Sequence, residues 1–414
     1  MAAKSSLALY GGKPTREKPL PVMHPGATAV DQEEIDAVIE VLKAQSMYRF
    51  YGPKFLNITG KFENDLAAYV GTRHALAVTS GTAALHSALV GLGVGPGDEV
   101  ILPTYCWVAC PDAVFATGAT PVLANVDESL TLDPKDVESK VTNRTKAVMA
   151  VHIRGVPCDL DALSRITKEY EISLLEDAAQ CGGGSYHGKR VGTIGIVGSY
   201  SFQLNKMISA GEGGAVVTDD DTIYERALMF HDVGTPYRVN DEKEFRYKID
   251  PFPGINYRTN EVSSAILRVQ LRKIDSLVRQ LRTNKAKIKK GISNIGGITF
   301  RKLPDPNGEV AVGLVFFVEN GKKALEFRDA LKAENIQTPS GSYPGVVYDP
   351  NAYDGHVFMA WGHILPGIRK VKNKYQQSLD LMGRAVHLDI SPLDTEEEIN
   401  DIIEAIHKVA SVVL

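Results

Sequence analysis

The residue best suited to covalent chemistry is Lys206, in the segment SYSFQLNKMISAGEGGAVVT (199–218). It lies in a polar loop, five residues after Ser201 and five before Gly211, and an apolar run typical of a strand follows at 215–218. A lysine framed in this way can be held beside a buried pocket, where it can form a Schiff base with a carbonyl cofactor or substrate. The same frame also fits an exposed lysine in a turn, so this segment alone leaves both interpretations open.

A second motif, TSGTAAL (79–85), leaves an apolar strand through a glycine and enters a helix. Gly81 allows the backbone to approach a ligand closely, and the free N–H groups of a helix N-terminus suit a phosphate. An ordinary capped helix start has the same pattern. Ser201 is a further candidate phosphate ligand, because its hydroxyl can bind the phosphate while Lys206 reaches an aldehyde.

The run LLEDAAQ (174–180) ends an apolar strand with acidic residues. Asp177 can pair with a protonated heterocyclic nitrogen and keep it charged, which makes the ring of pyridoxal phosphate an electron sink. The same aspartate can equally cap a helix. Gln180, three residues further on, can donate a hydrogen bond to the phenolic oxygen of that cofactor.

Two aromatic residues, Tyr105 and Trp107, follow another apolar run in PTYCWVA (103–109). If the chain stays extended there, both side chains point the same way, because side chains alternate along a strand. Either ring could stack on a planar cofactor, whereas core packing is the simpler interpretation of a single aromatic residue.

The elements that must position these residues are short apolar runs that alternate with amphipathic helices between about 74 and 220. This alternation predicts an α/β fold with a mostly parallel seven-stranded sheet covered by helices on both faces. Ligands bind beyond the carboxyl ends of such strands, where Ser80, Asp177 and Lys206 lie. The predicted strands are 75–80, 99–105, 120–126, 146–153, 172–180, 198–203 and 213–219.

Helical patterns precede and follow this region. Asp31 with Glu34 forms a capping-box-like start, and Ile35, Val38, Ile39 and Leu42 then repeat at helical spacing. A long helical region covers 261–292, and a final helix begins with a second capping box, Thr395 and Glu398. The apolar stripe of that helix is Ile399, Ile402, Ile403, Ile406 and Val409.

Length and helix placement predict three parts: an N-terminal arm (1–55), a large cofactor-binding domain (56–275) and a smaller α+β C-terminal domain (276–414).

The composition is that of a soluble globular protein, with 44% hydrophobic and 23% charged residues. A net charge of −4 gives no basic field for nucleic acid, and no apolar run is long enough for a membrane span. The first residues lack the apolar core of a signal peptide, so a cytoplasmic location is expected. The four cysteines fit no zinc-ligand spacing, which predicts free thiols and no structural metal, with Cys106 and Cys110 packing as small apolar residues.

Five ordered motifs carry a resemblance that runs from LALYGGKP (7–14) to the C-terminal helix: SGTAAL, GDEVILPTYCW, LLEDAAQ, SFQLNKMISAGEGG and GINYRTNE. Together they resemble the fold-type I pyridoxal-phosphate enzymes, and more closely the DegT/StrS sugar aminotransferases. The resemblance implies that Lys206 forms the Schiff base with pyridoxal phosphate and that Asp177 faces the pyridine nitrogen. It further implies that Gln180 contacts the ring's O3′ atom and that Trp107 stacks on its face.

For the phosphate group, the resemblance implies Gly81, Thr82 and Ser201 as ligands. Asn256, in GINYRTNE, would reach the phosphate of the neighbouring subunit, which implies a homodimer with shared active sites. Arg258, two residues away, is also suited to an anion. One departure from the family is Ile196, where relatives usually carry an acidic residue.

The activity implied is transfer of an amino group from glutamate or glutamine to a keto or aldehydo sugar, with Lys206 as general base and acid. Some segments, including 301–318, are similar to enzymes that form 8-amino-Kdo, and others to cyclitol aminotransferases. A dehydratase or ring-aromatising relative is the alternative, and a non-catalytic regulator is a further one. Of the histidines, His152 is expected to be a buried structural residue, whereas His231 could lie near the substrate entrance.

Overall fold

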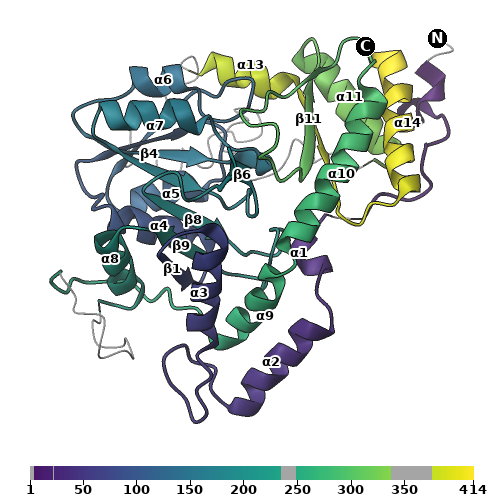
Figure 1. Ribbon diagram of the computed structural model, residues 1–414. Coiled ribbons are helices and arrows are strands. Elements are labelled where there is room, and N and C mark those ends of the chain that lie inside the picture. The colour runs from purple at the N-terminus through teal and green to yellow at the C-terminus, as the bar shows by residue number, and fades with distance from the viewer. Residues whose placement is uncertain (1–3, 22, 235–248, 337–374) are drawn as a thin grey trace.

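The computed structural model describes residues 4–21, 23–234, 249–336 and 375–414. Its largest unit is a seven-stranded sheet with the strand order β1-β9-β8-β5-β4-β2-β3 (Figure 1). Strands β2, β3, β4, β5 and β8 are parallel to their neighbours among these five, and β9 runs antiparallel to β1 and β8. The predicted, mostly parallel seven-stranded sheet is therefore confirmed. The strands are β1 (His74–Val78), β2 (Glu99–Pro103), β3 (Thr120–Ala124), β4 (Thr145–Val151), β5 (Ser173–Asp177), β8 (Val197–Ser201) and β9 (Gly214–Thr218).

Helices cover both faces of this sheet, because the strands are apolar on both sides. In β4, Val148 and Ala150 pack into one core with helices α3 (Ile58–Val70) and α7 (Leu160–Glu169). Met149 points to the other face. The helices packed there are α4 (Gly81–Gly91), α5 (Ala109–Ala116) and α8 (Asp221–His231).

Helix α2 (Gln32–Ala44) begins at the predicted capping box: Asp31 accepts from the amide of Glu33, and Glu34 accepts from the amide of Asp31. Its inner face places Val41 against α3 and α9 (Glu261–Leu271). The predicted helix is confirmed, but its stripe of Ile35, Ile39 and Leu42 is exposed to solvent. Figure 1 shows α2 at the lower edge of the molecule, away from the sheet.

The predicted helical region 261–292 is two helices, α9 and α10 (Ile274–Ile292), which meet at Arg272 and Lys273. A second, antiparallel sheet of order β10-β11-β12 packs against the C-terminal part of α10. In the final helix, the predicted cap Thr395 is confirmed, and so is the apolar stripe, of which Ile403 is partly buried and the other members are buried. The elements here are β10 (Thr299–Phe300), β11 (Gly313–Phe317), β12 (Ala385–Asp389), α11 (Gly321–Ala333), α13 (Gln376–Arg384) and α14 (Glu396–Val413).

Both ends of the chain lie beside this smaller sheet (Figure 1). The buried carboxylate of Glu334 accepts hydrogen bonds from the amides of Ala8 and Thr15 and from the ammonium of Lys408. The start of the predicted N-terminal arm is therefore bound to the C-terminal part of the chain. The domain boundaries at residues 55 and 275 stay predictions.

Several short elements connect these units. The remaining elements are α1 (Pro25–Thr28), α6 (Pro134–Ser139), β6 (Ser185–Tyr186), β7 (Lys189–Arg190) and three 3₁₀ turns at Lys4–Ser6, Ala8–Tyr10 and Ile153–Gly155.

None of the helices in the described residues is long and apolar enough to cross a membrane.

Candidate active site

Lys206 lies in the loop between β8 and β9, at the carboxyl edge of the parallel strands. Its backbone is held on both sides: its N–H donates to Gln203, and its carbonyl oxygen accepts from the N–H of Gly26 at 3.0 Å. Burial lowers the pKa of the Lys206 amine, an effect that the nearby negative charges of Asp177 and Glu212 oppose. The lysine is thus fixed in place and loses its proton more easily than a lysine in water.

Asp177 is the last residue of β5 and is 5% exposed. Its Oδ1 accepts from the N–H of Ala179 at 3.0 Å, and its Oδ2 accepts from the thiol of Cys110 at 3.2 Å. All four cysteines are free and buried, as predicted. Cys106 and Cys110 pack in the apolar core, as predicted, and the Sγ atom of Cys110 in addition contacts this carboxylate.

A cradle for an anion lies at the start of α4. Ser80 caps the helix. Its side chain accepts a hydrogen bond from the N–H of Ala83, and its carbonyl oxygen accepts one from the N–H of Ala84. These two bonds leave the amides of Gly81 and Thr82 at the first turn for a ligand. Ser201 lies directly against Gly81.

Only glycine fits at this contact. A Cβ atom at position 81 would lie 2.7 Å from the Cβ of Ser201 and 3.0 Å from its Oγ. The structure therefore brings together Gly81 and Ser201, from two different strand ends, as the sequence predicted for phosphate ligands.

Gln180 lies beside the turn that follows β4. Its Oε1 accepts the backbone N–H of Arg154 at 2.8 Å. Because a backbone N–H requires an acceptor, this bond fixes which end of the amide faces Arg154. The amide NH₂ of Gln180 remains as a donor, which is the group needed for a phenolic oxygen. The guanidinium of Arg154 in turn contacts Asp389 at the end of β12.

The two aromatic residues after β2 differ in environment. Regular extension ends at Pro103, so the condition under which Tyr105 and Trp107 would point the same way is not met. Tyr105 is buried and makes an edge contact with His387, whereas Trp107 is 44% exposed. Trp107 is therefore the ring available for stacking.

Asn256 belongs to a segment that pairs with the end of β1, where the N–H of Thr79 donates to the carbonyl of Tyr257. Asn256 is exposed, and its Oδ1 accepts the N–H of Arg258. The guanidinium of Arg258 pairs with Asp232. His231 is completely buried, where its Nε2 faces Arg49 and its Nδ1 faces the carbonyl of Leu228. A position of His231 at a substrate entrance is therefore not supported.

Glu176, next to Asp177, is a buried anchor that the sequence reasoning missed. Its carboxylate accepts the amides of Gly192, Ile194 and Gly195 at 2.6–2.7 Å. It also faces Nε2 of His152 at 2.9 Å. His152 is a buried structural histidine, as predicted.

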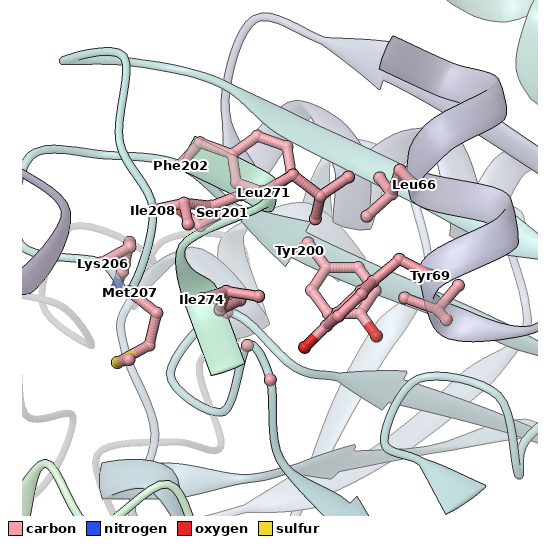
Figure 2. A pocket seen from close by; sticks show the side chains of 14 residues that line it. Leu66, Tyr69, Tyr200, Ser201, Phe202, Lys206, Met207, Ile208, Leu271 and Ile274 are labelled. Atoms are coloured by element: carbon pink, nitrogen blue, oxygen red, sulfur yellow. The ribbon is translucent and has the colours of Figure 1, made fainter. Parts of the chain in front are cut away.

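A small apolar cavity of about 20 Å³, room for about one water molecule, lies beside the lysine loop. Figure 2 shows Lys206 and Met207 on one side of it and Tyr69 and Tyr200 on the other. The two tyrosine hydroxyls bond to Asp275 and to the carbonyl of Val191. The cavity is too small for a cofactor and shows that the lysine loop packs on an apolar base.

The described part of the chain contains no group of three or more His, Cys, Asp or Glu side chains that could hold a metal ion.

A sheet of this order with a lysine on the β8–β9 loop defines the class of pyridoxal-phosphate-dependent aminotransferases. The chain belongs to the DegT/DnrJ/EryC1/StrS aminotransferase family, whose profile matches residues 28–407. It is 30% identical to GDP-perosamine synthase of Escherichia coli O157:H7 over 392 residues, 94% of this chain and 98% of that one. It is 39% identical to 3-amino-5-hydroxybenzoate synthase of Amycolatopsis mediterranei over 251 residues, 60% and 62% of the two chains.

Among solved structures, DesV of S. venezuelae superposes with a TM-score of 0.79 at 32% identity, covering 95% of this chain and 99% of that one. The fold-type I prediction and the predicted family are confirmed.

The residues present fit pyridoxal phosphate, the cofactor of this family. Asp177 is a buried carboxylate suited to a protonated ring nitrogen, and Lys206 is an amine of lowered pKa suited to an aldehyde. Ser201 lies against the glycine at the N-terminus of α4, where a phosphate would be held.

Proposed function

We propose that this chain moves an amino group from glutamate or glutamine to a keto or aldehydo sugar in amino-sugar biosynthesis. The observation that carries the proposal is that the Lys206 amine, whose pKa is lowered by burial, lies near enough to the buried carboxylate of Asp177 to be influenced by its charge. When bound, pyridoxal phosphate supplies a protonated ring that withdraws electrons from the reacting carbon. Sugar aminotransferases among the relatives support the substrate class.

In this proposal each residue has one task. Asp177 would accept a hydrogen bond from the ring N–H and keep the ring nitrogen charged. Gln180 would donate a hydrogen bond from its NH₂ group to the phenolic oxygen. Trp107 covers one face of the ring, and Gly81, Thr82 and Ser201 bind the phosphate. Lys206, made less basic by burial, takes the proton from Cα of the amino donor and later returns a proton to the sugar carbon.

The test is to supply ¹⁵N-labelled glutamate or glutamine with nucleotide-linked keto-sugars, inososes and oxidised Kdo. Label should appear in the sugar with wild-type protein and with Lys146→Ala, which changes an exposed lysine in β4. It should be absent with Lys206→Ala. Full nitrogen transfer by Lys206→Ala would refute the assigned base, and the lack of transfer to any acceptor would refute the substrate class.

A second candidate is a ring-aromatising activity, which the 39% identity to 3-amino-5-hydroxybenzoate synthase favours. The two activities differ in a measurable way. Transfer moves labelled nitrogen between molecules, whereas aromatisation releases water from a cyclic precursor and creates an aromatic absorption band. Mass and absorption spectra of the same reaction mixtures therefore separate them.

We also propose a homodimer with shared active sites in the cytoplasm. The exposed apolar stripe of α2, formed by Ile35, Ile39 and Leu42, is a surface that a second copy of the chain would cover. Asn256 is exposed, its Oδ1 accepts the N–H of Arg258, and its NH₂ group has no partner within the described ranges. That amide would reach the phosphate bound in the partner.

A further inference from the structure

The thiol of Cys110 occupies a position between two residues assigned to the cofactor ring. Its Sγ donates to Oδ2 of Asp177 at 3.2 Å, and its backbone N–H donates to the carbonyl of Trp107 at 3.0 Å. Cys110 is completely buried in the first turn of α5. The residue therefore links the ring-nitrogen carboxylate to the stacking tryptophan.

Among the described residues, the carboxylate of Asp177 has one hydrogen-bond partner on each oxygen. The amide of Ala179 bonds to Oδ1, so the thiol is the partner on the other oxygen, Oδ2. A carboxylate oxygen has room for more than one donor, and a ring N–H can share Oδ2 with the thiol. The strength of the hydrogen bond from Cys110 to Asp177 then affects how strongly the carboxylate attracts the proton on the ring nitrogen.

The surroundings of Cys110 favour the protonated thiol. A hydrogen bond with Cys106 and burial raise the pKa of the Cys110 thiol well above its usual value. The nearby charge of Asp177 acts in the same direction. Cys110 can therefore act toward the carboxylate only as a neutral S–H donor.

We propose that Cys110 is a positioning residue that orients the Asp177 carboxylate and, as a weak donor, leaves it basic enough to keep the ring nitrogen protonated. This inference rests on the proposed function, in which Asp177 binds that nitrogen. A stronger donor stabilises the carboxylate charge and makes it a poorer partner for the ring proton. A thiol donates more weakly than a hydroxyl, so cysteine at position 110 preserves the basicity that serine would reduce.

The first experiment needs no cofactor. The S–H stretching band of Cys110, identified by its loss in Cys110→Ala, is measured by infrared spectroscopy in the cofactor-free protein. Donation to a charged carboxylate lowers the frequency of this band, so Asp177→Asn should raise it. A band that does not move in Asp177→Asn overturns the proposal.

The second experiment measures the pKa of the ring nitrogen by ¹⁵N NMR of protein loaded with ¹⁵N-labelled pyridoxal phosphate. The proton affinity should fall in the order Cys110→Ala, wild type, Cys110→Ser, with steps of about threefold, as expected for a small difference in hydrogen-bond strength. Cys181→Ser is the matched control, since Cys181 is also a completely buried thiol. It should leave the affinity unchanged.

Equal ring-nitrogen pKa values in Cys110→Ser, Cys181→Ser and wild type would overturn the proposal, as would any other order. Failure of the proposed function has a different signature. In that case labelled nitrogen would reach no sugar acceptor, while the infrared measurement would still report on the thiol and its carboxylate.

Discussion

The backbone N–H of Gly26 donates a 3.0 Å hydrogen bond to the carbonyl oxygen of Lys206. The two residues are 180 positions apart in the sequence, and Gln270 completes the contact. Its side chain accepts the N–H of Ser209 and donates to the carbonyl of Gly26, both at 2.7 Å. The segment before α2 and helix α9 thus hold the loop that carries the lysine.

Gly26→Ala should displace this loop. The added Cβ would lie 2.7 Å from the amide nitrogen of Ser209 and 2.8 Å from the backbone of Ile208, neither of which can move alone. We expect a loss of about 1–3 kcal/mol of stability, typical of overpacking, and a weaker affinity for pyridoxal phosphate. Urea unfolding and cofactor titration measure the two effects. Gly95→Ala, where a Cβ meets no atom within 4 Å, is the control. Equal stability and equal cofactor affinity of the two variants would show that the contact of Gly26 does not hold the lysine loop.

Gln270→Leu should be more damaging than its position on a helix suggests. It leaves the Ser209 amide and the Gly26 carbonyl buried without their partner, at a cost of about 1–3 kcal/mol for each group. Gln376→Leu removes an exposed amide on α13 that bonds to exposed Asp380 of the same helix, and should cost little. Calorimetry of the cofactor-free proteins compares them. If Gln270→Leu melts at the wild-type temperature, Gln270 does not hold the loop.

The sheet could be predicted closely from the sequence because its strands are apolar on both faces. All seven predicted strands begin within one residue of those observed. Each was predicted to run one to three residues too far, since apolar or aromatic residues such as Tyr105 continue the pattern beyond the point where the chain leaves the sheet.

The candidate site also has residues whose positions the sequence could predict and residues whose positions it could not. Lys206, Asp177, Gly81 and Ser201 follow strand ends, so their meeting at one edge follows from parallel strands. The contacts of Cys110 with Asp177 could not be predicted, because they depend on how α5 docks. Nothing in local spacing reports such a long-range contact, and the same is true of Gly26.

The apolar stripe of α2 tests the proposed dimer. Ile39→Glu places a charge at its centre, so burying the stripe against a second copy becomes unfavourable. We expect self-association weaker by at least about tenfold, a change of about 1.4 kcal/mol, and a matching loss of cofactor affinity as Asn256 leaves its partner site. Analytical ultracentrifugation measures the first. Leu325→Glu changes an exposed leucine on α11 and should remain dimeric. A monomeric wild type would exclude the shared sites.

Two buried lysines should respond in opposite ways to removal of their charge. Burial lowers the pKa of both Lys206 and Lys285, but Lys285 is paired with the buried carboxylate of Glu309. Lys285→Met leaves that carboxylate uncompensated and should cost about 3–5 kcal/mol. Lys206→Met instead removes a buried amine whose role is chemical and whose charge is costly to bury. The cofactor-free variant should therefore be more stable than wild type at neutral pH.

The pH dependence follows from the direction of the Lys206 shift. Below both the folded and the unfolded pKa, the folded protein carries the full cost of the buried ammonium ion. Between the two values the unfolded chain binds more protons, so stability rises with pH, and above both the cost is gone. The gain from Lys206→Met should therefore be largest below the folded pKa of Lys206 and shrink as the pH rises from there toward the unfolded pKa. Urea midpoints of the cofactor-free proteins across that range measure it. A gain that does not change with pH, or a variant less stable than wild type, would show that the amine is not desolvated as the fold implies.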